Sequence, residues 1–289
     1  MYAVGSDEFH AVSELLQMLK RDFNGDEYTR RLESRISDVG YVSLGVPGMG
    51  TTLMMAMGIA SIAVVSILLE YGANIQSVDV MGNDAFMFAS IFGRPKNLQC
   101  WLERVNDWDL NRQNTVVGGC ALGCGVYMGA NKLETVKVLL DAGVSLDFRT
   151  FSGGTLLMNA VENEDSDPSV VRLVLEKLKN SYHDKEFTSI VNYKRTSTTL
   201  EWKGIYSVAK VLYRTGASKV GLMKFLAIDS RTSALNLAVV RGDVEIVKIL
   251  LECGADPYVE NDLGMNAFEI CDEAGPFPSV RNVLEEYKK

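Results

Sequence analysis

The sequence is poor in the residue types that support much enzyme chemistry. Its 289 residues include only two histidines, His10 and His183, which leaves little material for histidine-based catalysis or a histidine-rich metal site. With only six prolines, a proline-rich linker is not expected. The formal charge of −8 argues against a generally basic nucleic-acid footprint. Hydrophobic residues at 47% and charged residues at 23% are ordinary for a globular chain.

Cysteine is also scarce, and its count is odd. The five residues are Cys100, Cys120, Cys124, Cys253 and Cys271. Scattered cysteines in a chain of this length predict free thiols in the cytoplasm or another reducing intracellular compartment. Cys120 and Cys124 are four residues apart, but no histidine or second cysteine pair nearby completes a zinc site. We therefore expect no metal and no cofactor.

The sequence predicts no secretory signal, but it contains one long apolar segment that could be a membrane span. Residues 1–8 show no basic leader followed by an apolar core, so no secretory signal is predicted. Residues 39–69 carry no charge, and the apolar part, 53–69, has nearly the length of a membrane span. Gly58 and Ser61 divide that part into two short pieces. An anchor through residues 53–69 remains the lesser alternative, because the same segment fits a repeat.

An internal repeat organises most of the chain. Residues 52–74 align without a gap on residues 234–256, and the next unit follows after 33 residues in both places. The segment Ser233-Ala234-Leu235-Asn236-Leu237-Ala238 and the later Gly254-Ala255-Asp256 resemble the ankyrin repeat, which has a period of about 33 residues and a T-P-L-H-x-A opening. Weaker copies begin near residues 85, 121, 156 and 267.

The resemblance implies an all-α fold, an ankyrin-repeat solenoid of helix-turn-helix repeats with hairpin loops. Residues 1–44 are predicted to form an N-terminal helical cap, and residues 45–289 an array of about six to seven repeats. Leu157 and Leu235 lie 78 residues apart, two periods plus about twelve residues. We expect that gap to hold one divergent repeat around residues 205–226 and a basic insertion near 180–203.

No pattern in the sequence favours catalysis. Residues 45–52 resemble a phosphate-binding loop, but Thr51 stands where that loop needs lysine, so a turn entering the first repeat is the better interpretation. The carboxylates between Glu162 and Asp167 read as a solvated loop. There is no nucleophile elbow, and the two histidines are far apart in sequence. The chain is not expected to be an enzyme.

The expected function is a non-catalytic scaffold or adaptor that binds a protein partner on the concave ankyrin face. The alternative is a structural subunit permanently embedded in a larger complex. Neither a membrane nor nucleic acid is an expected partner.

The family's partner-facing positions lie beside the hairpin glycine and at the end of the first helix. In this sequence the apolar ones are Ile59, Val80, Met81, Ile91, Phe92, Val116, Val117, Tyr127, Met128 and Phe151. The matching C-terminal positions are polar, namely Asp229, Ser230, Arg241, Asp262 and Glu273. Two alternatives stay open: these apolar side chains form the core, or residues 1–44 fold back over them.

A second candidate surface is the basic segment 185–224. The residues that would form a patch for an anionic partner are Lys194, Arg195, Lys203, Lys210 and Arg214. Interleaved aromatic residues are compatible with single-stranded nucleic acid, but of these two partners an acidic protein is preferred. The favoured interpretation of the segment is a solvated face over an aromatic core, with some lysines paired to acidic neighbours.

The first prediction concerns local stability. The histidine of the T-P-L-H opening is replaced in every repeat, so hydrogen bonds that join neighbouring repeats in the family are expected to be few. Glycine weakens a helix by about 1 kcal/mol per position, and residues 118–129 hold Gly118, Gly119, Gly123, Gly125 and Gly129. Hydrogen exchange should therefore be fastest in this segment among the repeats, and uniform protection across it would contradict the prediction.

Overall fold

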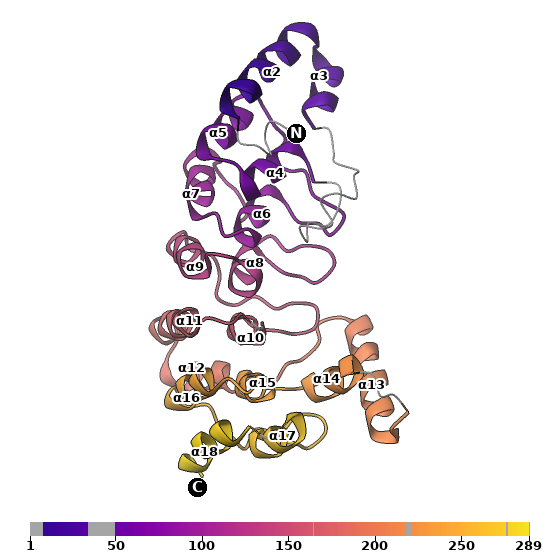
Figure 1. Ribbon diagram of the computed structural model, residues 1–289, viewed down its shortest axis with the longest axis vertical. Helices are drawn as coiled ribbons and strands as arrows, with labels where there is room; N and C mark the ends of the chain where they lie inside the picture. The colour runs from indigo at the N-terminus through magenta and orange to yellow at the C-terminus, as the bar shows by residue number, and fades with distance from the viewer. Residues whose placement is uncertain (1–7, 34–49, 164, 218–220, 276, 289) are drawn as a thin grey trace. The chain divides into compact units, whose positions relative to one another are not determined.

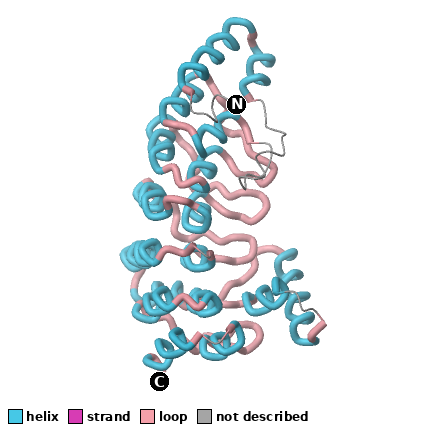
Figure 2. The backbone as a smooth tube through the Cα atoms, viewed as in Figure 1, coloured by secondary structure: helices cyan, strands magenta, loops and turns pink. Residues whose placement is uncertain are grey.

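The computed structural model describes residues 8–33, 50–163, 165–217, 221–275 and 277–288. These residues form seventeen helices and, within the described ranges, no β-strand (Figures 1 and 2). The chain divides into two compact units, Met1–Ser145 and Leu146–Lys289. The sequence prediction of an all-α repeat fold is confirmed in both units.

The first unit contains a helix pair followed by three helical hairpins. Its helices are α2 Phe9–Asp22, α3 Gly25–Leu32, α4 Thr52–Ile59, α5 Ile62–Glu70, α6 Ala85–Ile91, α7 Pro95–Arg104, α8 Ala121–Met128 and α9 Lys132–Asp141. The first helices of the hairpins pack in the order α4, α6, α8, and the second helices in the order α5, α7, α9. Helix α2 packs on α3 and α5. Residues 34–49, which include the predicted end of the cap and most of the phosphate-loop-like motif, lie outside the described residues.

The second unit stacks three further hairpins. Its helices are α10 Leu156–Glu162, α11 Pro168–Ser181, α12 Asp184–Val191, α13 Leu200–Thr215, α14 Gly221–Asp229, α15 Ala234–Arg241, α16 Val244–Glu252, α17 Ala267–Ala274 and α18 Pro278–Glu286. Helix α15 packs between α10 and α17, and α16 packs between α11 and α18. Helices α13 and α14 pair with each other beside this stack (Figure 1).

Side-chain caps set where the first helices begin. The side chains of Thr51, Asp84, Thr155, Ser233 and Asn266 each accept a hydrogen bond from a backbone N–H in the first turn of the helix that follows. Such caps satisfy N–H groups that have no partner within the helix. The same positions stand where the family has threonine, so the sequence alignment and the cap geometry agree.

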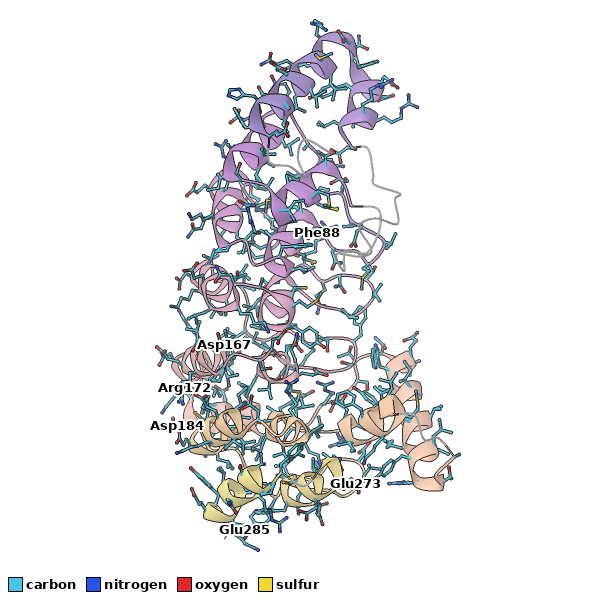
Figure 3. The ribbon with its side chains drawn as sticks, in the orientation of Figure 1. Phe88, Asp167, Arg172, Asp184, Glu273 and Glu285 are labelled. Atoms are coloured by element: carbon cyan, nitrogen blue, oxygen red, sulfur yellow. The ribbon has the colours of Figure 1, made fainter. Side chains whose placement is uncertain are left out.

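The first helices are buried almost completely. All of α4 from Thr52 to Gly58 is buried, and Phe88 of α6 is 1% exposed (Figure 3). Ala56, Ala89 and Ala238, the small residues of the repeat pattern, are fully buried. A short helix buried on all sides needs neighbours on both sides, which is why repeats of this kind stabilise one another.

Amide side chains tie neighbouring hairpins together. Asn97 of α7 donates from Nδ2 to the carbonyl oxygens of Met57 and Ala60 at 3.0 and 2.9 Å. Asn236, which replaces the family's histidine, donates to the carbonyl oxygen of Val259 at 3.1 Å. Hydrogen bonds between repeats are therefore present, and they come partly from residues outside the T-P-L-H pattern.

The long gap between Leu157 and Leu235 differs from the sequence prediction. Because α10 packs directly on α15 and α11 on α16, no intervening repeat lies between these hairpins. The backbone N–H of Arg195 donates to the carbonyl oxygen of Thr232 at 2.8 Å, closing a hairpin from which residues 196–229 loop out. The predicted helix pair around 205–226 exists as α13 and α14, but it is an insertion within one repeat.

The apolar segment 53–69 forms two helices. Helix α4 ends at Ile59 and α5 begins at Ile62, with the turn at the Gly58–Ser61 interruption. Among the described residues, no helix is long and apolar enough to cross a membrane.

The second prediction concerns Asp84, the cap of α6. Burial raises the pKa of Asp84 to about 6, against the hydrogen bond from Met87 and the charge of Arg112. A carboxyl group whose pKa is about 3.9 in the unfolded chain and higher in the folded chain destabilises the fold as pH rises through both values, by up to about 3 kcal/mol here. Asparagine caps a helix about as well as aspartate.

Asp84→Asn should therefore increase the free energy of unfolding at pH 7.5 by about 1–3 kcal/mol and change it little at pH 4. Urea unfolding at both pH values measures the difference. A stability difference that does not grow with pH would contradict the assignment.

Candidate partner-binding site

Two of the loops that join successive helical hairpins of the first unit, residues 79–83 and 114–119, are themselves tight backbone hairpins closed by hydrogen bonds within the loop. The N–H of Asp79 donates to the carbonyl of Asn83, and the N–H of Asn114 donates to the carbonyl of Gly119, both at 2.9 Å. The Asp79 carboxylate also accepts from the backbone N–H groups of Met81 and Asn83, both at 2.8 Å. Local side-chain bonds of this kind stabilise tight turns.

The two hairpins are also bonded to each other. Asn114 donates from Nδ2 to Oδ1 of Asn83 at 2.9 Å, and the N–H of Thr115 donates to the carbonyl of Met81 at 2.9 Å. Gly82 has φ of +79°, and a Cβ there would lie 2.7 Å from the backbone nitrogen of Thr115. Glycine is therefore required both by conformation and by the close approach of the next hairpin.

Apolar side chains project from this bonded framework. Val80 is 59% exposed and Val116 is 49% exposed, while Met128 at the end of α8 is 50% exposed. Val117 and Tyr127 are exposed as well. Ile59, Met81, Ile91, Phe92 and Phe151 are half-buried. None of the ten predicted positions is buried in the core, so the alternative that they form the core is wrong for these residues.

Phe92 has a packing role in addition to its exposure. A Cβ added to Gly58 would lie 2.8 Å from the Phe92 ring, and the rings of Phe88 and Phe92 stack with centroids 6.1 Å apart. Replacing Phe92 would therefore disturb α4 and α6 together with the surface. Val80, Val116 and Met128 are better positions for testing binding.

The first unit brings nine of the ten predicted residues together, from α4, α6, α8 and their hairpins. Phe151 belongs to the second unit. Its carbonyl oxygen accepts a hydrogen bond from the backbone N–H of Thr198 at 3.0 Å. It therefore helps to hold the segment that follows Arg195.

Glycines in α8 and directly after it serve close packing. A Cβ on Gly125 would lie 3.3 Å from Cγ2 of Thr135, and one on Gly129 would lie 3.1 Å from the carbonyl oxygen of Ser90. The helix is thereby fitted between α6 and α9. This close packing opposes the intrinsic weakness of glycine in helices. Fast hydrogen exchange in residues 118–129 therefore stays a prediction.

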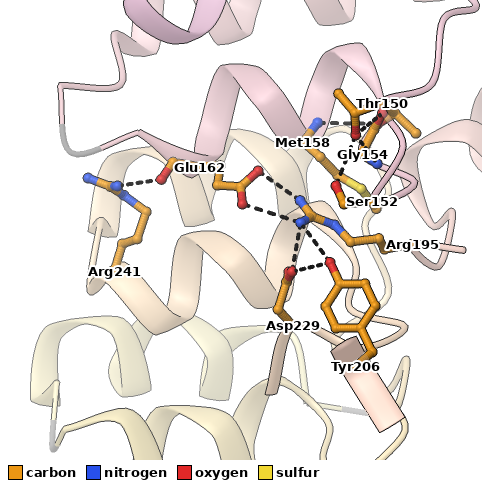
Figure 4. Close-up of polar contacts among 10 residues, drawn as sticks. Thr150, Ser152, Gly154, Met158, Glu162, Arg195, Tyr206, Asp229 and Arg241 are labelled. Carbon is orange, nitrogen blue, oxygen red and sulfur yellow. Dashed lines mark hydrogen bonds and ion pairs between the residues drawn. The ribbon is translucent and has the colours of Figure 1, made fainter. Parts of the chain in front are cut away.

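The predicted anionic-partner patch is wrong at Arg195. Its side chain is 3% exposed and forms ion pairs with Glu162 and Asp229 at 2.8 and 2.7 Å (Figure 4). Arg195 is buried because the insertion brings Asp229, at the end of α14, to the guanidinium that also binds Glu162 of α10. Asp229 and Ser230, predicted to lie on a polar surface, are 2% and 4% exposed and are corrected with it.

The other basic residues of the patch have mixed surroundings. Lys210 forms an ion pair with Asp262 at 2.7 Å, and Arg214 donates to the carbonyl oxygen of Asp262 at 3.1 Å. Lys203 is exposed and Lys194 is half-buried. The interpretation in which some lysines pair with acidic neighbours describes Lys210.

The group formed by Arg195, Glu162, Asp229 and Tyr206 is named here the buried ion cluster (Figure 4). The hydroxyl of Tyr206 donates to Oδ2 of Asp229 at 2.7 Å. Burial raises the pKa of Asp229 to about 6, against the lowering effect of Arg195. Burial lowers the pKa of Arg195, but the charges of Asp229 and Glu162 outweigh burial and hold it above its ordinary value. The cluster thus joins α10, α13 and α14 through charged hydrogen bonds.

No sequence pattern predicted this cluster, because its members are spread along the chain from residue 162 to residue 229. Its chemistry is structural, since each carboxylate faces the same guanidinium. Within the described ranges, no group of three or more histidine, cysteine, aspartate or glutamate residues could hold a metal ion.

Comparison with known proteins agrees with this geometry. The ankyrin-repeat family model matches residues 231–262, around α15 and α16. The crystal structure of the ankyrin repeat domain of Bcl-3, an IκB-family protein, superposes with a TM-score of 0.61 at 22% identity, covering 98% of this chain and 96% of that one. A chain from the complex of the endopeptidase Bd0816 of Bdellovibrio bacteriovorus with the immunity protein Bd3460 gives 0.56 at 20% identity, covering 82% and 97%.

A curated relative shares part of the sequence. The mitochondrial disaggregase of Bos taurus is 28% identical over 160 residues, which are 55% of this chain and 22% of that protein. The chain thus spans about a fifth of the length of that relative.

Stacked helical hairpins joined by bonded loops define a helical solenoid. Residues 231–262 match the ankyrin repeat, and the chain has the ankyrin-repeat fold. Ankyrin repeats typically serve as protein-interaction modules.

The third prediction tests the buried ion cluster. Arg195→Met leaves Glu162 and Asp229 without their cation, and removing one partner of a buried ion pair costs about 3–5 kcal/mol. Lys210→Met removes an ion pair whose side chains are 24% and 26% exposed, and it should cost less than about 1 kcal/mol. Urea unfolding of the two variants at pH 7.5 compares them directly. Equal losses would show that the cluster does not hold the insertion to the stack.

Proposed function

We propose that this protein is a non-catalytic adaptor whose partner protein docks on the hairpins and first-helix ends of the first unit. The observation that carries the proposal is the set of exposed apolar side chains on hydrogen-bonded hairpins, with Val80, Val116 and Met128 each about half exposed. Contiguous exposed apolar residues mark an interaction surface more often than chance.

The framework beneath those residues supports the proposal energetically. Asp79, Asn83 and Asn114 are nearly fully buried and fix the hairpin backbone before any partner arrives. A surface that is already ordered loses little conformational entropy on binding. Aromatic and methionine side chains such as Tyr127 and Met128 suit the centre of a protein interface.

We also propose that residues 1–44 form a helical cap for the array in residues 45–289. Two contacts support a cap: the hydroxyl of Tyr28 donates to the carbonyl of Tyr71 at 2.7 Å, and the Glu33 carboxylate accepts from the backbone N–H of Asn74 at 2.7 Å.

A reducing intracellular compartment fits the five free cysteines. A permanent role in a larger complex is the second candidate, and it would use the same surface.

The fourth prediction concerns this surface. Val80→Asp combined with Met128→Glu should weaken partner binding at least about tenfold without loss of helical circular dichroism, because charge replaces contact area at exposed positions. The matched control, Leu15→Asp with Met18→Glu, changes two residues of α2 that are 49% and 48% exposed.

Affinity capture with the wild-type chain, followed by mass spectrometry, identifies the partner, and calorimetry compares the variants. Equal binding by both double variants would place the partner elsewhere. Gel filtration separates the two roles: an adaptor is monodisperse alone, whereas an embedded subunit aggregates.

A further inference from the structure

The inserted helix α13 is held to the second unit by one face. Tyr206 and Ala209 are 4% and 0% exposed. Lys210 pairs with Asp262, and the hydroxyl of Tyr213 donates to Oε1 of Glu273 at 3.0 Å (Figure 3 labels Glu273). Lys224 of α14 pairs with the same carboxylate at 3.0 Å. These contacts fix which side of α13 faces away from the stack.

The opposite face of α13 is apolar and exposed. Leu200 is 79%, Val208 57% and Val211 60% exposed, and Ile205 is 41% exposed. Ile205, Val208 and Val211 are three residues apart and share one face of the helix, and Leu200 lies eleven residues, about three turns, before Val211 and so points to the same side. These side chains form an apolar strip. A Cβ on Gly204 would meet nothing within 4 Å, so the strip includes a point where another backbone can come close. We name these residues the α13 outer face.

One edge of the α13 outer face is basic. Lys203 and Arg214 are exposed and eleven residues apart, which is about three helical turns and therefore the same side of the helix. The other edge holds Leu212 and, eleven residues before it, the exposed acidic Glu201, whereas Trp202 lies toward the buried side beside Tyr206. Glu201, in the first turn, is the acidic residue of α13.

We infer that the α13 outer face docks an amphipathic helix of a partner protein, with an acidic edge lying against Lys203 and Arg214. An apolar strip at helical spacing is the complement of another amphipathic helix. Charge complementarity along one edge fixes the direction of that helix and steers its approach. An antiparallel second copy fits less well, because its basic edge would lie against the basic edge of the first copy.

This surface lies in residues 200–214, whereas the proposed adaptor surface lies in the first unit. The two are therefore tested by different variants. Val208 and Val80 are matched in residue type and exposure, at 57% and 59%. Glutamate at either position leaves the buried core untouched.

The fifth prediction uses the full chain and two synthetic helical peptides, each about as long as the 16-residue α13. Both carry leucine on one face; one has glutamate along one edge, and the other has lysine there. Fluorescence anisotropy should show that the glutamate peptide binds and that the lysine peptide binds about tenfold more weakly or worse. Val208→Glu should weaken binding of the glutamate peptide at least about tenfold, and Val80→Glu should leave it unchanged. Lys203→Glu should reduce the preference for the glutamate peptide.

Three outcomes would overturn the inference. Equal binding of both peptides would show that charge plays no part in docking. Equal effects of Val208→Glu and Val80→Glu would show that the peptide does not use the α13 outer face. Sedimentation of the chain alone as a dimer that Val208→Glu dissociates would assign the face to a second copy of the chain.

Discussion

The structure depends on short helices that bury their apolar side chains only against their neighbours. Helix α4 is buried from Thr52 to Gly58, a burial that a single hairpin cannot provide. Small residues such as Ala56 and Ala238 let adjacent helices approach, and the polar caps at Thr51 and Ser233 satisfy the helix starts inside this packed environment. The amides of Asn97 and Asn236 then bond carbonyl groups that burial would otherwise leave without partners.

The same constraint shapes the candidate surface. Stacked helices bring successive hairpins close enough for Asn114 to bond Asn83 and for Thr115 to bond Met81. The loops are therefore ordered by buried polar contacts, while Val80 and Val116 remain exposed at their tips. An ordered loop with exposed apolar side chains is suited to binding, because the entropy of ordering has already been lost in folding.

The insertion shows how a repeat accommodates additional helices without breaking the stack. The hydrogen bond from Arg195 to Thr232 restores the hairpin closure that sequence neighbours make elsewhere. The Arg195 side chain then forms ion pairs with Glu162 of α10, in the stack, and with Asp229 at the end of α14. One residue thus joins the stack to both ends of the insertion. Buried ions add little net stability, and their value here lies in fixing one arrangement of α13 and α14.

The sequence by itself determined the repeat, its period and its helix starts, because these depend on spacing and on capping residues that act within one turn. The family alignment also offered Val80, Val116 and Met128 as partner-facing positions, but it left open that they form the core, and only their exposure in the structure removes that alternative. Only the tertiary structure shows that Arg195 is buried in ion pairs and that the inserted helices lie within one repeat. Glu162, Arg195 and Asp229 lie 33 and 34 residues apart, and neither local propensity nor periodicity shows that burial brings their charges together.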